Sequence, residues 1–154
     1  MSANVKVARA VWSGGFKFTA ISGSGHSIVM DAAAEHGGED AGARPMEVLL
    51  ATLAGCTGMD MITVLRKQRQ PVEGLEILVH GQQADQHPKK YTDITVEYVI
   101  HGNDISPDAV ERAIRLSEEQ YCSVAATLKG AATITSTYRI EPEYELEPAL
   151  EMED

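Results

Sequence analysis

The 154-residue sequence has few cysteines, few basic residues and no long apolar run. Two cysteines are too few for a disulfide scaffold, so we expect free thiols or a reversible redox pair. A net charge of −10, from 13 basic and 23 acidic residues, argues against binding to nucleic acid or to an anionic membrane. The chain has no run of apolar residues long enough to span a membrane and no apolar signal core at its N-terminus. We therefore expect a cytoplasmic protein.

The negative charge is concentrated at the C-terminus. Residues 141–154 carry seven acidic and no basic side chains, whereas residues 1–140 hold 16 acidic and 13 basic ones, a net charge of −3. The length suits one domain. We therefore predict one domain over residues 1–140 and a weakly ordered acidic tail over residues 141–154.

The predicted elements follow the order β-β-β-α-β-β-α-β, which indicates an α+β fold because the strands come in groups. Glycine-rich turns separate the first three strands, and a polar, glycine-containing segment that reads as a mobile loop follows them. Proline opens each long helix, at the position where its missing N–H costs nothing. The predicted strands are 5–12, 16–21, 26–30, 75–80, 94–100 and 133–140, the loop is 31–44, and the helices are 45–68, 107–121 and a short 124–129.

The first predicted helix is apolar on nearly every side, which indicates a buried helix. One polar stripe runs along it, formed by Thr52, Cys56, Asp60 and Thr63, which lie within about 40° of Cys56 at 100° per residue. An unpaired carboxylate is too costly inside a core, so Asp60 must be paired, hydrated or protonated. The stripe therefore either bonds back to the helix and reaches a partner, or lines a cavity.

Cys122 falls where the second helix ends and the next short helical segment begins. The free N–H groups at a helix start favour a thiolate and lower its pKa, which would make Cys122 reactive. A buried cysteine that serves only as a small apolar side chain is the alternative.

Two stretches resemble the two cysteine motifs of the osmotically inducible protein C and organic hydroperoxide resistance (OsmC/Ohr) family. They are residues 45–57, PMEVLLATLAGCT, and residues 121–129, YCSVAATLK. The resemblance covers about residues 3–140, including the order of strands and helices.

The resemblance implies an OsmC-like fold, with two long central helices in an intertwined homodimer and an active site around each pair of cysteines. In the peroxidase members the first cysteine attacks a hydroperoxide and the second resolves the sulfenic acid to a disulfide, which an external dithiol reduces. Carried over to this sequence, Cys56 is the peroxidatic cysteine and Cys122 the resolving one. No haem, metal or other cofactor is implied.

Two positions depart from the hydroperoxide-resistance branch, which places an arginine after the Gly-Gly turn and a glutamate after the helix-opening proline. Here Gly14-Gly15 is followed by Phe16, and Pro45 by Met46. The chain therefore resembles the OsmC-like branch more closely. The residues that could support the Cys56 thiolate instead are Arg44, Glu47, Arg9 and Lys17.

Two functions follow from these features. The first is a thiol-dependent peroxidase acting on organic hydroperoxides, and the second is a ligand-binding or redox-sensing protein with an apolar pocket at the dimer interface. The residues expected to line that pocket are Leu49, Thr52, Leu53, Met59 and Asp60. The five histidines show no short ligand spacing, so we predict no metal site.

Overall fold

The computed structural model describes residues 4–142. The chain divides into two compact units, Met1–Leu49 and Leu50–Asp154, which are described separately. Helix α1 (Pro45–Lys67) begins in the first unit and continues into the second. All but the first two residues of the predicted acidic tail lie outside the described residues.

The first unit contains an antiparallel three-stranded sheet in the order β1-β2-β3, formed by β1 (Ala8–Trp12), β2 (Phe18–Ser22) and β3 (Ser27–Met30). Gly14 and Gly15 have φ angles of 98° and 55°, a conformation that glycine adopts without steric cost. The turns and the three strands agree with the prediction, although β1 begins later than expected.

The segment between β3 and α1 is folded around one carboxylate, unlike the mobile loop that its glycines predict. Asp31 is 3% exposed and accepts hydrogen bonds from the backbone N–H groups of Ala32, Glu39 and Ala41 at 2.8, 3.0 and 3.1 Å. Burial raises the pKa of the Asp31 carboxyl, but these three bonds outweigh it and hold the pKa below its usual value. A short helix, η1 (Ala34–His36), lies within this segment.

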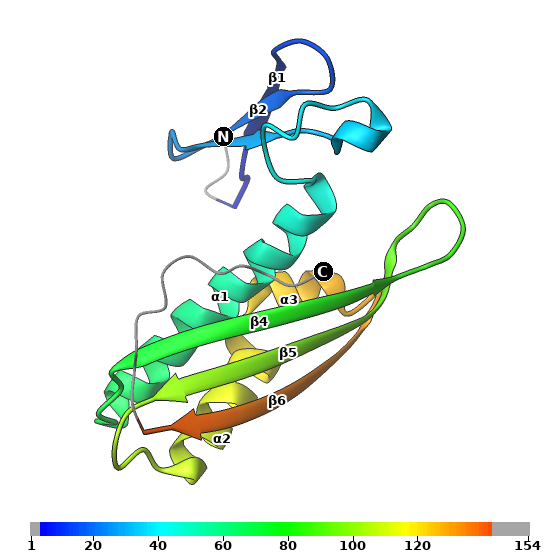
Figure 1. Ribbon diagram of the computed structural model, residues 1–154. Helices are drawn as coiled ribbons and strands as arrows, with labels where there is room; N and C mark the ends of the chain where they lie inside the picture. The colour runs from blue at the N-terminus through cyan, green and yellow to red at the C-terminus, as the bar shows by residue number, and fades with distance from the viewer. Residues whose placement is uncertain (1–3, 143–154) are drawn as a thin grey trace. The chain divides into compact units, whose positions relative to one another are not determined.

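The second unit is built on a mixed sheet in the order β4-β5-β6. Strands β4 (Gly74–Gln83) and β5 (Tyr91–His101) are antiparallel, and β6 (Thr133–Glu141) is parallel to β5. A parallel pair needs a crossover, which here runs through α2 (Pro107–Leu116), the π-helical turn η2 (Ser117–Tyr121) and α3 (Ser123–Leu128). These helices and α1 lie on the same face of the sheet (Figure 1).

The core of this unit forms where α1 and α2 meet the sheet. The apolar residues of α2 are three and four positions apart, which places them on one face, and that face is buried. Ser106 begins α2 as an N-cap, its side chain accepting a hydrogen bond from the Ala109 N–H at 3.3 Å. The fully buried side chains include Leu53, Met61 and Leu65 of α1, Ile94, Tyr98 and Ile100 of β5, and Val110 of α2.

Helix α1 is buried along one face only, so the prediction of a helix buried on every side is wrong for the single chain. Its buried residues are Leu53, Thr57, Met61, Val64 and Leu65, out of 23. The apolar side chains on the other faces reach the surface. By length and composition α1 is also apolar enough to cross a membrane, with a mean hydropathy of 1.8 over its most apolar window, a property that the core helices of soluble proteins share.

Candidate active site

The second unit brings the two cysteines together beside Asp60. The sulfur atoms of Cys56 and Cys122 and a carboxylate oxygen of Asp60 all lie within 4.8 Å of one another. Cys56 and Asp60 are one turn apart on α1 and therefore share a face. Cys122 comes from the other side of the cluster, at the junction of η2 and α3.

The backbone around Cys122 explains how its sulfur is held. Cys122 has an extended conformation between two helical segments, with φ −74° and ψ 96°. Its N–H donates to the Ser117 carbonyl at 2.8 Å. Its sulfur accepts a hydrogen bond from the Ala125 N–H at 3.3 Å, so the side chain serves as the N-cap of α3.

The thiol of Cys122 is held in its protonated form, and the prediction of a lowered pKa is wrong. Burial, with 3% of the residue exposed, raises the pKa of the Cys122 thiol to about 11. The Ala125 N–H opposes this shift, and the neighbouring Cys56 and Asp60 add to it. The single N–H at the start of a short helix is a weaker influence than desolvation.

Asp60 is paired, one of the three alternatives that its place in the polar stripe allowed. The hydroxyl of Ser117, which is fully buried, donates to Asp60 Oδ2 at 2.9 Å. Nothing in the sequence indicates that the Ser117 hydroxyl meets α1. Thr63 takes no part in this cluster, because its hydroxyl donates to the Met59 carbonyl at 2.8 Å on the exposed side.

The residues predicted to line an apolar pocket do not share one surface. Leu53 is fully buried in the core, whereas Met59 is 74% exposed. Thr52 is exposed, and Leu49 is half-buried at the end of the first unit. Of the predicted lining residues, Asp60 alone belongs to the cysteine cluster.

All four residues predicted to support the Cys56 thiolate lie in the first unit: Arg9, Lys17, Arg44 and Glu47. Lys17 pairs with Glu39 at 2.5 Å, and Arg44 pairs with Asp40 at 2.5 Å. Glu47 accepts a hydrogen bond from the Arg44 backbone N–H at 2.9 Å. The side-chain charges of Lys17 and Arg44 are therefore already engaged by carboxylates of their own unit.

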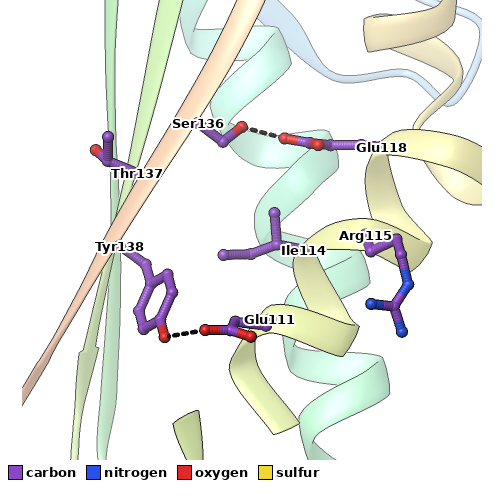
Figure 2. A pocket seen from close by; sticks show the side chains of 7 residues that line it. All are labelled: Glu111, Ile114, Arg115, Glu118, Ser136, Thr137 and Tyr138. Atoms are coloured by element: carbon purple, nitrogen blue, oxygen red, sulfur yellow. Dashed lines mark hydrogen bonds between the residues drawn. The ribbon is translucent and has the colours of Figure 1, made fainter. Parts of the chain in front are cut away.

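A cavity of about 200 Å³ lies between α2, η2 and β6, and Figure 2 shows its lining. Two pairs cross it: the Ser136 hydroxyl donates to Glu118, and the Tyr138 hydroxyl donates to Glu111 at 2.8 Å. None of the residues predicted to line an apolar pocket contributes to this cavity. The full lining is Glu111, Ile114, Arg115, Glu118, Ser136, Thr137 and Tyr138.

Comparison with known proteins gives the family. The profile of the family described as OsmC-like protein matches residues 37–137. Protein YhfA of Escherichia coli K12 is 36% identical over 124 residues, which cover 80% of this chain and 90% of YhfA.

Solved structures agree with this match. The crystal structure of a hypothetical protein from Aquifex aeolicus is 32% identical, covers 92% of this chain and 99% of its own, and superposes with a TM-score of 0.80. A Legionella pneumophila structure described as an organic hydroperoxide resistance protein OsmC has the same fold, at 16% identity and a TM-score of 0.65, and covers 90% of this chain and 98% of its own. The chain therefore belongs to the family of OsmC-like proteins.

Proposed function

We propose that this protein is a thiol-dependent peroxidase that reduces organic hydroperoxides through Cys56 and Cys122. The observation that supports this most directly is the approach of the two sulfur atoms to within 4.8 Å, from elements far apart in the sequence. A modest movement of either side chain would bring them to the 2.05 Å of a disulfide bond.

The proposed reaction has two steps in the protein. The Cys56 thiolate attacks the distal oxygen of the hydroperoxide, the O–O bond breaks, and the alkoxide takes a proton to leave as the alcohol. The resulting sulfenic acid condenses with the thiol of Cys122, releasing water and forming the Cys56–Cys122 disulfide. An external dithiol then reduces the disulfide by exchange and restores both thiols.

The two cysteines differ in a way that supports these roles. Cys56 is half-buried and Cys122 is 3% exposed. The raised pKa of Cys122 keeps its side chain a thiol at neutral pH. A thiol suits the resolving cysteine, which reacts with a sulfenic acid, whereas the cysteine that attacks the peroxide reacts as a thiolate. Structures described as organic hydroperoxide resistance proteins from Legionella pneumophila and Bacillus subtilis share the fold.

We further propose that the protein is a cytoplasmic homodimer. Apolar side chains are exposed in each unit, including Trp12 at 63% in the first and Met59 at 74% in the second. Exposed apolar surface of this extent is typical of an interface, and a second copy of the chain is the partner that the resemblance implies. Sedimentation equilibrium should give twice the chain mass, and Met59→Lys should shift the protein toward the monomer. A wild-type monomer at micromolar concentration would contradict this.

Turnover of cumene hydroperoxide with dithiothreitol tests the activity. The wild-type protein should consume hydroperoxide catalytically, Cys56→Ser should lose turnover, and Cys122→Ser should turn over more slowly, because dithiothreitol must then reduce the Cys56 sulfenic acid directly. Glu119→Gln changes an exposed carboxylate of η2 and serves as the matched control. Wild-type turnover no faster than that of Cys56→Ser would refute the peroxidase.

The second candidate is a ligand-binding or redox-sensing protein on the same fold. The observation that favours it is the engagement of Lys17 and Arg44 with carboxylates, which leaves these predicted activators neutralised within their own unit. Native mass spectrometry of the purified protein separates the candidates. A copurifying small molecule with slow turnover favours binding, whereas rapid turnover by a protein without ligand defeats it.

A further inference from the structure

The cysteine cluster contains one more potential metal ligand, the Asp60 carboxylate, than the proposed redox chemistry uses. Two thiol sulfurs and one carboxylate oxygen converge from two separate helical elements, and each of the three atoms lies within 4.8 Å of the other two. A disulfide needs only the sulfurs. The inward-facing carboxylate of Asp60 makes the cluster a mixed sulfur and oxygen ligand set of the kind that zinc accepts.

We propose that Cys56, Asp60 and Cys122 form a zinc site in the reduced protein, one ion per chain, contrary to the absence of a metal site that the histidine spacing predicts. With Zn–S bonds of about 2.3 Å and a Zn–O bond of about 2.0 Å, tetrahedral geometry places the sulfurs about 3.8 Å apart and each sulfur about 3.5 Å from the oxygen. The observed separations of at most 4.8 Å exceed the sulfur–sulfur value by at most about 1.0 Å and the sulfur–oxygen value by at most about 1.3 Å, a difference that rotation of the side chains can close.

The surroundings of the three ligands suit a metal site. Ser117 donates its hydroxyl hydrogen to Asp60 Oδ2 at 2.9 Å, a bond to a ligand of the kind that fixes the orientation of a coordinating carboxylate. The Ala125 N–H donates to the Cys122 sulfur at 3.3 Å, a bond that persists when the sulfur becomes a metal-bound thiolate. Three protein ligands leave the fourth position for water or another small donor.

Binding is an acid–base event with no change of oxidation state. Each thiol that coordinates the ion releases its proton to solvent, and the thiolate takes its place in the coordination sphere. A bound ion occupies the sulfur lone pairs that a hydroperoxide would meet. Zinc is therefore expected to block the proposed peroxidase chemistry at the same residues, and oxidation to the disulfide is expected to expel zinc.

Zinc titration of the reduced protein, without chelator or phosphate, tests the site. We expect one Zn²⁺ per chain by calorimetry and protection of both thiols from alkylation by iodoacetamide. Co²⁺ in place of zinc should give the intense visible bands of a tetrahedral ion and a thiolate-to-cobalt charge-transfer band.

Variants assign the ligands. Cys56→Ser should lose binding, and Asp60→Asn, which keeps the shape of the side chain, should weaken it by about tenfold or more. Ser117→Ala should weaken binding by about tenfold through loss of orientation, and Glu119→Gln should bind as the wild type does. Circular dichroism confirms that each variant is folded.

Two results would overturn the site. One is reduced wild-type protein that takes up no zinc, and the other is Asp60→Asn with unchanged affinity, which would show an unspecific dithiol. The zinc titration does not depend on the proposed peroxidase, because it uses no hydroperoxide. Turnover measured with a chelator present reports on the peroxidase alone.

Discussion

The raised pKa of Cys122 makes a prediction about its reactivity that can be measured directly. In the Cys56→Ser variant Cys122 is the single cysteine, so alkylation by iodoacetamide followed by mass spectrometry reports on it alone. Only the thiolate reacts, and its fraction falls tenfold for each unit by which the pKa exceeds the pH. In the wild type the shift from 9.0 to about 11 corresponds to about a hundredfold less thiolate than an ordinary cysteine carries at neutral pH, and the variant, which lacks the contributions of Cys56, should show a smaller reduction in the same direction.

The rate should accordingly keep rising with pH beyond 9.0, because burial still holds the pKa of the Cys122 thiol above that value. Removal of Cys56 abolishes its hydrogen bond and its charge, two of the smaller causes that raise the pKa of Cys122, while burial, the largest cause, remains. The same variant unfolded in urea is the control, and its rate should level off near 9.0. A midpoint at or below 9.0 in the folded protein would show that burial does not raise the pKa of Cys122, because the N–H of Ala125 would then outweigh it.

The same shift has a consequence for stability. The folded state holds the Cys122 proton more tightly than the unfolded state does, so the unfolded state releases this proton first as the pH rises. The contribution of Cys122 is fully present below pH 9.0 and is lost as the pH rises through about 11. Urea unfolding of the wild type should therefore become easier across this window, and Cys122→Ala should lose this part of the pH dependence. If the free energy of unfolding falls with pH equally steeply in the wild type and in Cys122→Ala, the contribution assigned to Cys122 is contradicted.

Three further predictions concern stability in urea unfolding. Ser117→Ala leaves an oxygen of Asp60 without its hydroxyl donor and should cost about 1–3 kcal/mol; a cost under about 0.3 kcal/mol would contradict the bond. The Tyr98 hydroxyl is buried without a hydrogen bond of good geometry, so Tyr98→Phe should be neutral or stabilise by up to about 1 kcal/mol, and a loss above about 1 kcal/mol would reveal a partner. A Cβ at Gly81 would lie 2.4 Å from the ring of Tyr91, so Gly81→Ala should lower the free energy of unfolding by about 1–3 kcal/mol. A Cβ at Gly55 on α1 would meet no atom within 4 Å, so Gly55→Ala should raise the free energy of unfolding by about 0.5–1 kcal/mol. Equal effects of the two substitutions would contradict the packing at Gly81.

The order of strands and helices could be predicted because local signals and tertiary packing agree. The glycine turns of the first sheet, the proline that opens each long helix and the apolar face of α2 all appear where the sequence indicates. The segment after β3 is folded, although its glycines predict a mobile loop. Asp31 accepts hydrogen bonds from N–H groups eight and ten residues away, and such contacts leave no local pattern in the sequence.

The cluster was only partly predictable. Helical periodicity placed Cys56 and Asp60 on one face of α1, but the carboxylate's partner, Ser117, is 57 residues away on another helix. The pKa of Cys122 was predicted with the wrong sign because sequence shows a helix start and not how deeply the sulfur is buried. The sequence overestimates the burial of α1 in the single chain. An apolar helix face indicates that the face packs against another surface, but it does not show whether that surface belongs to the same chain.

The measurement that tests the proposed function most directly is the mass of the reduced protein before and after one equivalent of cumene hydroperoxide, followed by non-reducing peptide mapping. We expect a loss of two hydrogens per chain and a single cross-linked peptide pair containing Cys56 and Cys122. Dithiothreitol should restore the original mass, and Cys122→Ser should instead gain one or more oxygens on Cys56. Two free thiols after complete mixing with hydroperoxide, in folded protein treated with chelator, would contradict the account.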